Sequence, residues 1–288
     1  MPHFKNQPLI RTCILGLLAV LLAPLALADL MLFPTRGEME KNQPATQVEL
    51  VNRGQATESD RISVVNRRMT VTGQIVEADN AEPDERFATD MLRYSPRQVT
   101  LKAGESQTVR ISLRKPAGLA NGEYRSHLQF DRLPDVEGSA NIEQTAKPVS
   151  GDFAIRLTAL VGASIPVIVR HGDTSASVTL DTLILEPGVK IEGQVDNPPL
   201  LAFHMNRSGS RSVYGNLLAT YTPPGGKPVD VSQVNGVAVY VPNSLRKAKL
   251  PIALPEGMAL KGGVIHLTFS QRPEDGGKPM AQASLALP

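Results

Sequence analysis

Hydrophobic and polar residues alternate along many short stretches of the chain, and turn-forming residues separate these stretches. In residues 46–51, Val48 and Leu50 fall on one face and Gln47 and Glu49 on the other. A period of two places alternate side chains on opposite faces of a strand, whereas a helix has a period of 3.6. No stretch with a helical apolar period stands out. The pattern therefore predicts an all-β protein.

Residues 94–113 show this alternation on both sides of a turn. Val99 and Leu101 alternate before residues 102–105, and three odd-numbered apolar residues alternate after them. Two period-2 stretches joined by a short glycine-containing turn are typical of paired neighbouring strands. The sequence therefore predicts a β-hairpin here, followed by another strand over residues 122–134.

The longest alternating stretch covers residues 153–170, where most odd positions are apolar. At about 3.3 Å per residue, one strand of this length exceeds roughly 50 Å, which is too long for a usual sandwich. Such a strand must bend, pass between domains or be interrupted, and Pro166 lies where a break or an edge position is needed. His171-Gly172-Asp173 then indicates a linker.

Two β-sandwiches account for this organisation. About seven strand signals fall in each half of the chain, the number typical of an immunoglobulin-like sandwich. We expect an N-terminal domain at residues 29–170 and a C-terminal domain at residues 171–288. Residues 135–152 are polar and rich in small side chains, which predicts a long loop between two strands.

Residues 1–28 have the pattern of a secretory signal peptide. Lys5 and Arg11 give a positive start, residues 13–28 carry no charge, and Ala26-Leu27-Ala28 supplies the small residues that a signal peptidase recognises. The apolar stretch is shorter than the roughly 20 residues that span a bilayer. The sequence therefore favours cleavage before Asp29, with no membrane insertion afterwards, over a membrane anchor.

Cleavage changes the composition of the mature chain. Without Lys5 and Arg11, Lys and Arg number 28, equal to the 28 Asp and Glu. A net charge near zero and few aromatic residues disfavour nucleic acid as a partner. The one cysteine, Cys13, leaves with the signal peptide, so the mature chain has no disulfide and no thiol nucleophile.

Motifs of catalysis do not stand out. The sequence has no nucleophile elbow, no phosphate-binding glycine loop and no metal-ligand spacing. Its histidines beyond residue 28 are scattered. These observations predict a protein that is not an enzyme and that needs no cofactor or metal.

Three segments, taken in order, resemble the periplasmic pilus chaperones of the chaperone–usher type. Residues 94–113 contain a proline followed by a stretch that ends in Val-Arg-apolar, residues 122–134 form a strand with Glu123 near its start and a proline at its end, and residues 165–170 run into the linker. The resemblance implies two immunoglobulin-like domains in an L shape and a periplasmic location. It implies a pilus or fimbrial subunit as one partner and an outer-membrane usher as the other.

The resemblance also implies that the last strand of the first domain completes a subunit that lacks one strand. Such donation satisfies backbone groups and fills an open groove, which is β-augmentation. The donor side chains would be Ile155, Leu157, Ala159 and Val161. The same alternation is typical of a strand that packs in its own core. A structural or adhesive surface protein with two sandwiches is therefore the alternative, and it would bury these side chains.

Two charged sites complete what the resemblance implies. Arg36, in Phe33-Pro34-Thr35-Arg36, matches a basic residue that binds the terminal carboxylate of the subunit, because a guanidinium can hold a carboxylate bidentately. Pro166 occupies the position of the second basic residue, so either Arg156 or Arg170 replaces it or the partner binds differently.

The other implied site is an ion-pair network that fixes the angle between the domains. The resemblance assigns Arg110 and Glu123 to this network, with Glu274 or Asp275 of the second domain as the third member. Exposed ion pairs contribute little stability one by one, so the value of such a network would be orientation.

Overall fold

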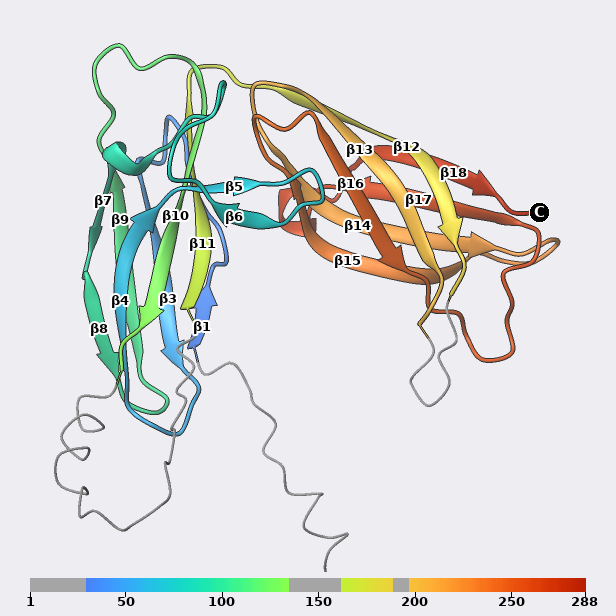
Figure 1. The fold of residues 1–288 in the computed structure, drawn as a ribbon, viewed down its shortest axis with the longest axis horizontal. Helices are drawn as coiled ribbons and strands as arrows, with labels where there is room; N and C mark the ends of the chain where they lie inside the picture. Colours follow the sequence, from blue (N-terminus) through green and yellow to red (C-terminus); the bar gives the residue numbers. More distant parts are fainter. Residues whose placement is uncertain (1–29, 135–161, 189–196) are drawn as a thin grey trace, which may run out of the picture.

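β-strands form two sandwiches that meet at an elbow (Figure 1). The computed structural model describes residues 30–134, 162–188 and 197–288. Within these ranges the helical structure consists of two short 3-10 turns, η1 at Thr89–Met91 and η2 at Pro273–Asp275. The prediction of an all-β protein is confirmed.

Several predictions fall outside the described residues. They concern the signal peptide at residues 1–28, the loop at residues 135–152, and the donor side chains Ile155, Leu157, Ala159 and Val161. Among the residues that are described, no helix is long and apolar enough to cross a membrane, and no three His, Cys, Asp or Glu side chains cluster as metal ligands.

The first sandwich consists of two sheets around one apolar core. The first sheet has the order β1-β3-β9-β7, with strands β1 Leu30–Phe33, β3 Ala45–Asn52, β9 Ser106–Leu113 and β7 Leu92–Ser95. The second has the order β2-β11-β10-β4-β8, with strands β2 Gly37–Met39, β11 Gly162–His171, β10 Gly122–Arg132, β4 Glu58–Val65 and β8 Gln98–Leu101. Alternate residues of both sheets face the core, as the sequence pattern predicts for β3, where Val48 and Leu50 are buried.

Two segments of the first domain change sheets. β1 pairs antiparallel with β3, and after residues 34–36 the chain continues as β2, which pairs parallel with β11. In the same way β7 pairs with β9, whereas β8 pairs with β4. The strands are thus divided as in an immunoglobulin-like sandwich. One sheet contains β1, β3, β9 and β7, which correspond to the first, second, fifth and fourth strands of that fold. The other contains β4, β10 and β11, which correspond to its third, sixth and seventh strands. The first crossing carries Arg36 to the side of the domain that faces the elbow.

The predicted hairpin at residues 94–113 is wrong. Its two arms, β8 and β9, belong to different sheets and pair with different neighbours, so the turn at residues 102–105 crosses the sandwich. Val99 and Val109 nevertheless both point into the core, each from its own side. Periodicity indicates which side chains are buried, but it does not indicate which strand lies beside which.

The second sandwich contains seven strands in the part of the chain that the structure describes. One sheet has the order β12-β13-β16, with strands β12 Ala176–Glu186, β13 Leu200–Gly209 and β16 Leu245–Pro251. The other has the order β15-β14-β17-β18, with strands β15 Val229–Val239, β14 Val213–Thr222, β17 Val264–Ser270 and β18 Pro279–Ala286. Phe203, Leu217, Tyr221 and Phe269 are among the large side chains of its core. The two-sandwich prediction is thereby confirmed.

A small hairpin of the first domain reaches the second domain. Its strands are β5 Arg67–Met69 and β6 Ile75–Glu77, and Figure 1 shows it extending into the elbow. The backbone amide of Lys247 donates to the carbonyl of Val71 at 2.7 Å, and Asn243 Nδ2 donates to the carbonyl of Met69 at 2.7 Å. Met69 also packs with Ile168 of β11 and with Ala238 and Tyr240 of the second domain.

Candidate functional site

β11 is paired unequally on its two sides. β10 accompanies it antiparallel from Gly162 to His171, whereas β2 accompanies it only from Val167 to Val169. In the part of the chain that the structure describes, residues 162–166 therefore have no strand on their second side. An unpaired row of backbone N–H and C=O groups is a template for another strand.

The side chains of β11 alternate between its own core and other surroundings. Ile165, Val167 and Val169 are buried in the core of the first sandwich. Pro166 lies opposite His127 of β10, immediately before the residues that pair with β2. The odd-numbered register of this strand therefore faces the space between the two sheets.

Arg36 lies where the chain crosses from β1 to β2, and it is buried between the domains. Its side chain is 4% exposed. Nε donates to Glu38 Oε1, and Nη1 donates to Tyr240 Oη at 3.2 Å. Nη2 is buried and has no hydrogen-bond partner among the described residues. The arginine for which the family resemblance implies carboxylate binding thus already holds one internal carboxylate.

Aromatic rings of the second domain alternate with guanidinium groups across the interface. Arg36 Cζ lies 4.4 Å from the ring centroid of Tyr214 and 5.5 Å from that of Tyr240. Arg125 stacks on the other side of this series, 4.1 Å from the Tyr240 ring, and Arg272 lies 5.2 Å from the Tyr214 ring. A desolvated cation over an aromatic face is attracted by the ring quadrupole. We call these five residues the Arg–Tyr stack.

Burial shifts the pKa values of two members of the Arg–Tyr stack. Burial lowers the pKa of Arg125, although Tyr240 and Glu123 counteract this effect. Burial also raises the pKa of Tyr240, and Arg36 and Arg125 oppose that rise. Both shifts follow from the removal of water from this part of the interface.

Arg170, at the end of β11, gathers three carboxylates. Its Nη1 donates to Glu38 Oε2 at 2.7 Å and to Glu40 Oε1 at 2.6 Å, and its Nε donates to Glu123 Oε2 at 3.1 Å. Burial raises the pKa of Glu38, but Arg36 and Arg170 outweigh this effect and lower that pKa to about 2. The Glu38 carboxylate therefore stays ionised and bridges the two arginines.

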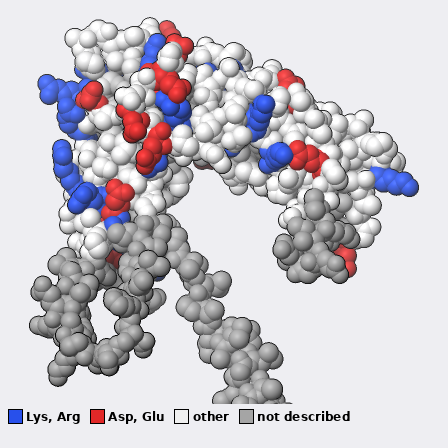
Figure 2. All heavy atoms as spheres, in the orientation of Figure 1, with Lys and Arg blue, Asp and Glu red and all other residues white. Residues whose placement is uncertain are grey.

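The residues around this bridge line a cleft between the domains, with a volume of about 580 Å³. Its charged lining consists of four arginines and three carboxylates: Arg36, Arg170, Arg211, Arg272, Glu38, Glu40 and Asp275. Figure 2 shows acidic and basic side chains close together on the first domain beside the elbow. The cleft is thus rich in charge of both signs, with one more arginine than carboxylate in its lining.

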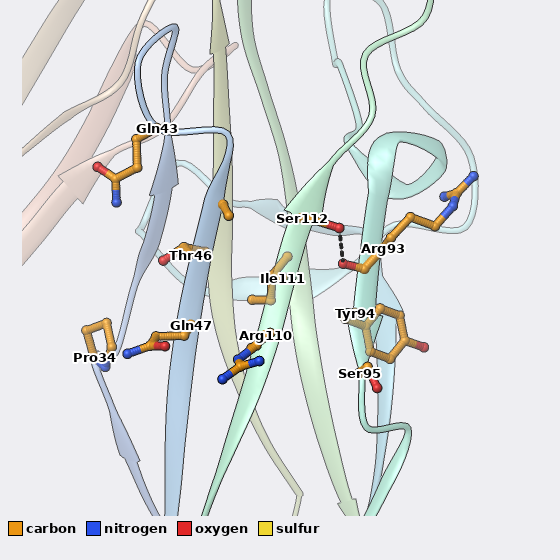
Figure 3. Close-up of a pocket in the computed structure, with 11 residues that line it drawn as sticks. Pro34, Gln43, Thr46, Gln47, Arg93, Tyr94, Ser95, Arg110, Ile111 and Ser112 are labelled. Carbon is orange, nitrogen blue, oxygen red and sulfur yellow. Dashed lines mark hydrogen bonds between the residues drawn. The ribbon is translucent and has the colours of Figure 1, made fainter.

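The predicted network residues do not lie together. Glu123 is in the interface, where its partners are Arg170 and Ser212. Arg110 points away from it, on the outer face of the first sheet. There it lines a groove of about 760 Å³ together with Gln47 and Tyr94 (Figure 3). No ion pair joins Arg110 to Glu123 within the described ranges.

Glu274 and Asp275 instead pair with an arginine of their own domain. Arg272 Nη1 lies 3.2 Å from Glu274 Oε1, and Arg272 Nε lies 2.7 Å from Asp275 Oδ2. Asp275 lines the cleft but does not bind Glu123. The residue that binds Glu123 from the second domain is Ser212.

Sequence reasoning missed Glu38, Ser212 and the pairing of Arg170 with Glu123. One signal could have found the last of these. If residues 122–131 and 162–171 are aligned as an antiparallel pair, Glu123 falls opposite Arg170, which is their register in the structure. Oppositely charged cross-strand neighbours stabilise such a pair. Nothing in the sequence singles out Ser212.

The overall chain resembles several solved structures. The YadV chaperone has 11% sequence identity and a TM-score of 0.42, with 90% of this chain and 100% of that chain covered. A chain of the CsuC–CsuE chaperone–tip adhesion subunit pre-assembly complex, from the archaic chaperone-usher Csu pili of Acinetobacter baumannii, has 15% identity and a TM-score of 0.44, with 90% and 98% covered. A chain of the Salmonella enterica SafA pilin–SafB chaperone complex has 15% identity and a TM-score of 0.40, with 92% and 99% covered.

No family model matches the sequence, and neither does any curated protein. Likeness to solved structures at these identities does not assign a function.

Proposed function

We propose that the protein is a periplasmic chaperone that binds subunits of a pilus or fimbrial-type polymer and delivers them to an outer-membrane usher. The observation that carries the proposal is the edge of β11, where residues 162–166 have β10 on one side and no described strand on the other. A subunit that lacks one strand can add its own edge there, so that the unpaired backbone groups of both proteins are satisfied.

The donor role extends to Ile155, Leu157, Ala159 and Val161, which lie outside the described residues. They carry odd numbers, as do Ile165 and Val167, which face the space between the sheets, so an unbroken strand would place all of them on that face. If each donor side chain buries about 100 Å² in the subunit, the four contribute on the order of 10 kcal/mol before ordering costs.

The cleft supports a second contact with the subunit. Arg36 lines it, and the buried Nη2 of this arginine lacks an acceptor. A carboxylate of the subunit can accept from that guanidinium. The two contacts lie at opposite ends of β11, because this strand runs from its free edge at residues 162–166 to Arg170 in the cleft.

The test is complex formation with a pilus subunit that is co-expressed in the periplasm. Wild-type protein should elute with the subunit as a one-to-one complex in size-exclusion chromatography. A Leu157→Glu and Val161→Glu double variant should lose the subunit, because charge cannot enter an apolar groove. Thr158→Glu is the matched control, since it adds the same charge on the other face of the segment, and it should keep the subunit. Circular dichroism checks that all three fold.

The alternative function, a structural or adhesive surface protein, makes the opposite prediction. It would bury these side chains in its own core, so the double variant would unfold and wild-type protein would bind no subunit. If the double variant folds and still retains the subunit, donation by this strand is wrong.

A further inference from the structure

One carboxylate, that of Glu38, bridges both arginines of the cleft. Glu38 lies on β2, the three-residue strand beside β11. Its Oε1 accepts from Arg36 Nε and its Oε2 accepts from Arg170 Nη1 at 2.7 Å. The side chain is 33% exposed and lines the cleft, so it is accessible from the cleft.

This bridge leaves the fork of Arg36 half filled. The Nε–H and an Nη2–H of an arginine point the same way and match the two oxygens of one carboxylate. Glu38 supplies one oxygen to Nε, but its other oxygen is held by Arg170. The Nη2 of Arg36 is consequently buried without an acceptor among the described residues. A carboxylate that is not tied to Arg170 can accept from both nitrogens at once.

The two arginines depend on Glu38 to different degrees. Arg170 also binds Glu40 and Glu123, so it remains paired when Glu38 leaves. For Arg36, Glu38 is the one ion-pair partner within the described ranges. Displacing Glu38 therefore frees a single guanidinium, and an incoming carboxylate would gain one more hydrogen bond there than Glu38 makes.

The charge of the cleft also accommodates another acid. Its lining contains four arginines and three carboxylates. A fourth carboxylate makes the two numbers equal. A basic ligand would instead add to the existing excess of arginine.

We propose that Glu38 is a displaceable internal carboxylate that occupies the Arg36 site until a carboxylate of the bound subunit replaces it. This inference rests on the proposed function for the identity of the incoming acid, a chain-terminal or side-chain carboxylate of the subunit. Exchange keeps Arg36 paired at every stage, and it moves Glu38 toward solvent. The bridge thus closes the site in the free protein and makes capture depend on the incoming carboxylate.

The test uses sodium acetate as the probe and the arginine Nε–Hε resonance of Arg36 as the readout, with sodium chloride as the ionic-strength control. Glu38→Gln and Glu38→Ala remove the competing charge, and acetate should bind at Arg36 about tenfold more tightly than in wild-type protein, because a charged hydrogen bond no longer opposes it. Glu40→Gln is the matched control, since Glu40 contacts Arg170 but not Arg36, and its acetate affinity should stay close to that of wild type.

Equal or weaker acetate binding in both Glu38 variants, with folding intact by circular dichroism, overturns the proposal. A gain of the same size in Glu40→Gln also overturns it, because the effect would then be general loss of negative charge. Co-expression with the pilus subunit separates this result from the proposed function. If neither wild type nor Glu38→Gln binds any subunit, the chaperone function fails, while the acetate titration still decides the role of Glu38.

Discussion

Ser212 of the second domain donates two hydrogen bonds to the buried carboxylate of Glu123 in the first domain. The backbone amide of Ser212 donates to Oε2 at 3.1 Å, and its hydroxyl donates to Oε1. Arg170 Nε donates to the same Oε2, so one acid connects β10, β11 and the second sandwich. The Glu123 side chain is fully buried, which makes its pairing costly to break.

Replacing Glu123 should therefore destabilise the protein strongly. We expect Glu123→Ala to lower the free energy of unfolding by about 3–5 kcal/mol, because Arg170 and Ser212 lose a buried acceptor. Urea unfolding followed by circular dichroism measures this change. Glu40→Ala is the matched control, since it also removes a carboxylate from Arg170 but a half-exposed one, and it should cost less than about 1 kcal/mol. Equal effects of the two substitutions would contradict the assignment.

Gly73, in the turn of the β5–β6 hairpin, touches the second domain. Its φ is +86°, and a Cβ there would lie 2.4 Å from Arg246 Nε. Arg246 Nη1 donates to the Ala238 carbonyl at 2.6 Å, so moving the guanidinium away breaks that bond. Gly104 has a similar φ of +78° with open space around it.

Gly73→Ala should accordingly destabilise the protein more than Gly104→Ala does. Backbone strain costs about 1–2 kcal/mol at either site, and the lost hydrogen bond adds about 1 kcal/mol at Gly73 alone. Urea unfolding of the two variants gives the difference, and small-angle X-ray scattering detects any change in the angle between the domains. If both variants lose the same stability, the contact with Arg246 does not contribute.

We expect Tyr240 to support the Arg–Tyr stack through its ring more than through its hydroxyl. Tyr240→Phe keeps both stacked cations and removes only the hydrogen bond from Arg36, so we expect a cost of about 1 kcal/mol. Tyr240→Leu also removes the ring from Arg125, whose Nε and Nη1 are buried without partners among the described residues. We expect it to cost at least about 2 kcal/mol more. Thermal or urea unfolding measures the stability of both variants. If Tyr240→Leu is as stable as Tyr240→Phe, the ring does not have this role.

His127 should make the stability fall in mild acid. It is buried on β10, its Nδ1 has no partner in the described part of the chain, and burial together with Arg125 and Arg67 lowers its pKa from 6.5 to about 3. The unfolded chain binds a proton near pH 6.5 whereas the folded protein does not, so stability is complete above 6.5 and is lost as the pH falls toward 3. The slope reaches at most about 1.4 kcal/mol per pH unit.

His127→Gln should flatten this profile at pH values above 4.5. The window is diagnostic because the stability that Glu38 contributes is lost only below 4.5, as the pH falls toward its folded pKa of about 2. Urea unfolding over a pH series measures the slope, and NMR of the ring shows whether His127 stays neutral in the folded protein. An unchanged slope in the variant, or a ring that titrates near 6.5, contradicts the prediction.

The sequence predicts strands better than it predicts their neighbours. The period-2 pattern at residues 46–51 identifies β3 and its buried residues, since side-chain direction depends only on local backbone geometry. The same pattern at residues 94–113 suggests a hairpin, yet β8 and β9 join different sheets. The β5–β6 hairpin is missed as well. Its strands have only three residues each, too few to show an alternating pattern, and the second domain contacts Met69 and the turn at Val71.

Only part of the charged site could be predicted, again because the sequence does not show which strands are neighbours. Arg36 and Glu123 lie at the interface. Arg110 does not, because it occupies an outward position of β9, and the arginine opposite Glu123 is Arg170. Selecting the correct arginine requires the register between β10 and β11, and a long polar segment separates them in the sequence. The opposite charges of Glu123 and Arg170 indicate that register only once the two strands are paired with each other.

The β5–β6 hairpin of the first domain makes the second domain depend on contacts from outside itself. A sandwich from another protein, fused after residue 172, would have to present a donor to the Met69 carbonyl, as Asn243 does, and a backbone amide to the Val71 carbonyl, as Lys247 does. Modular exchange of C-terminal halves among such proteins is therefore constrained to pairs that also match at residues 67–77. Recombination at the linker alone would lose these two hydrogen bonds between the halves.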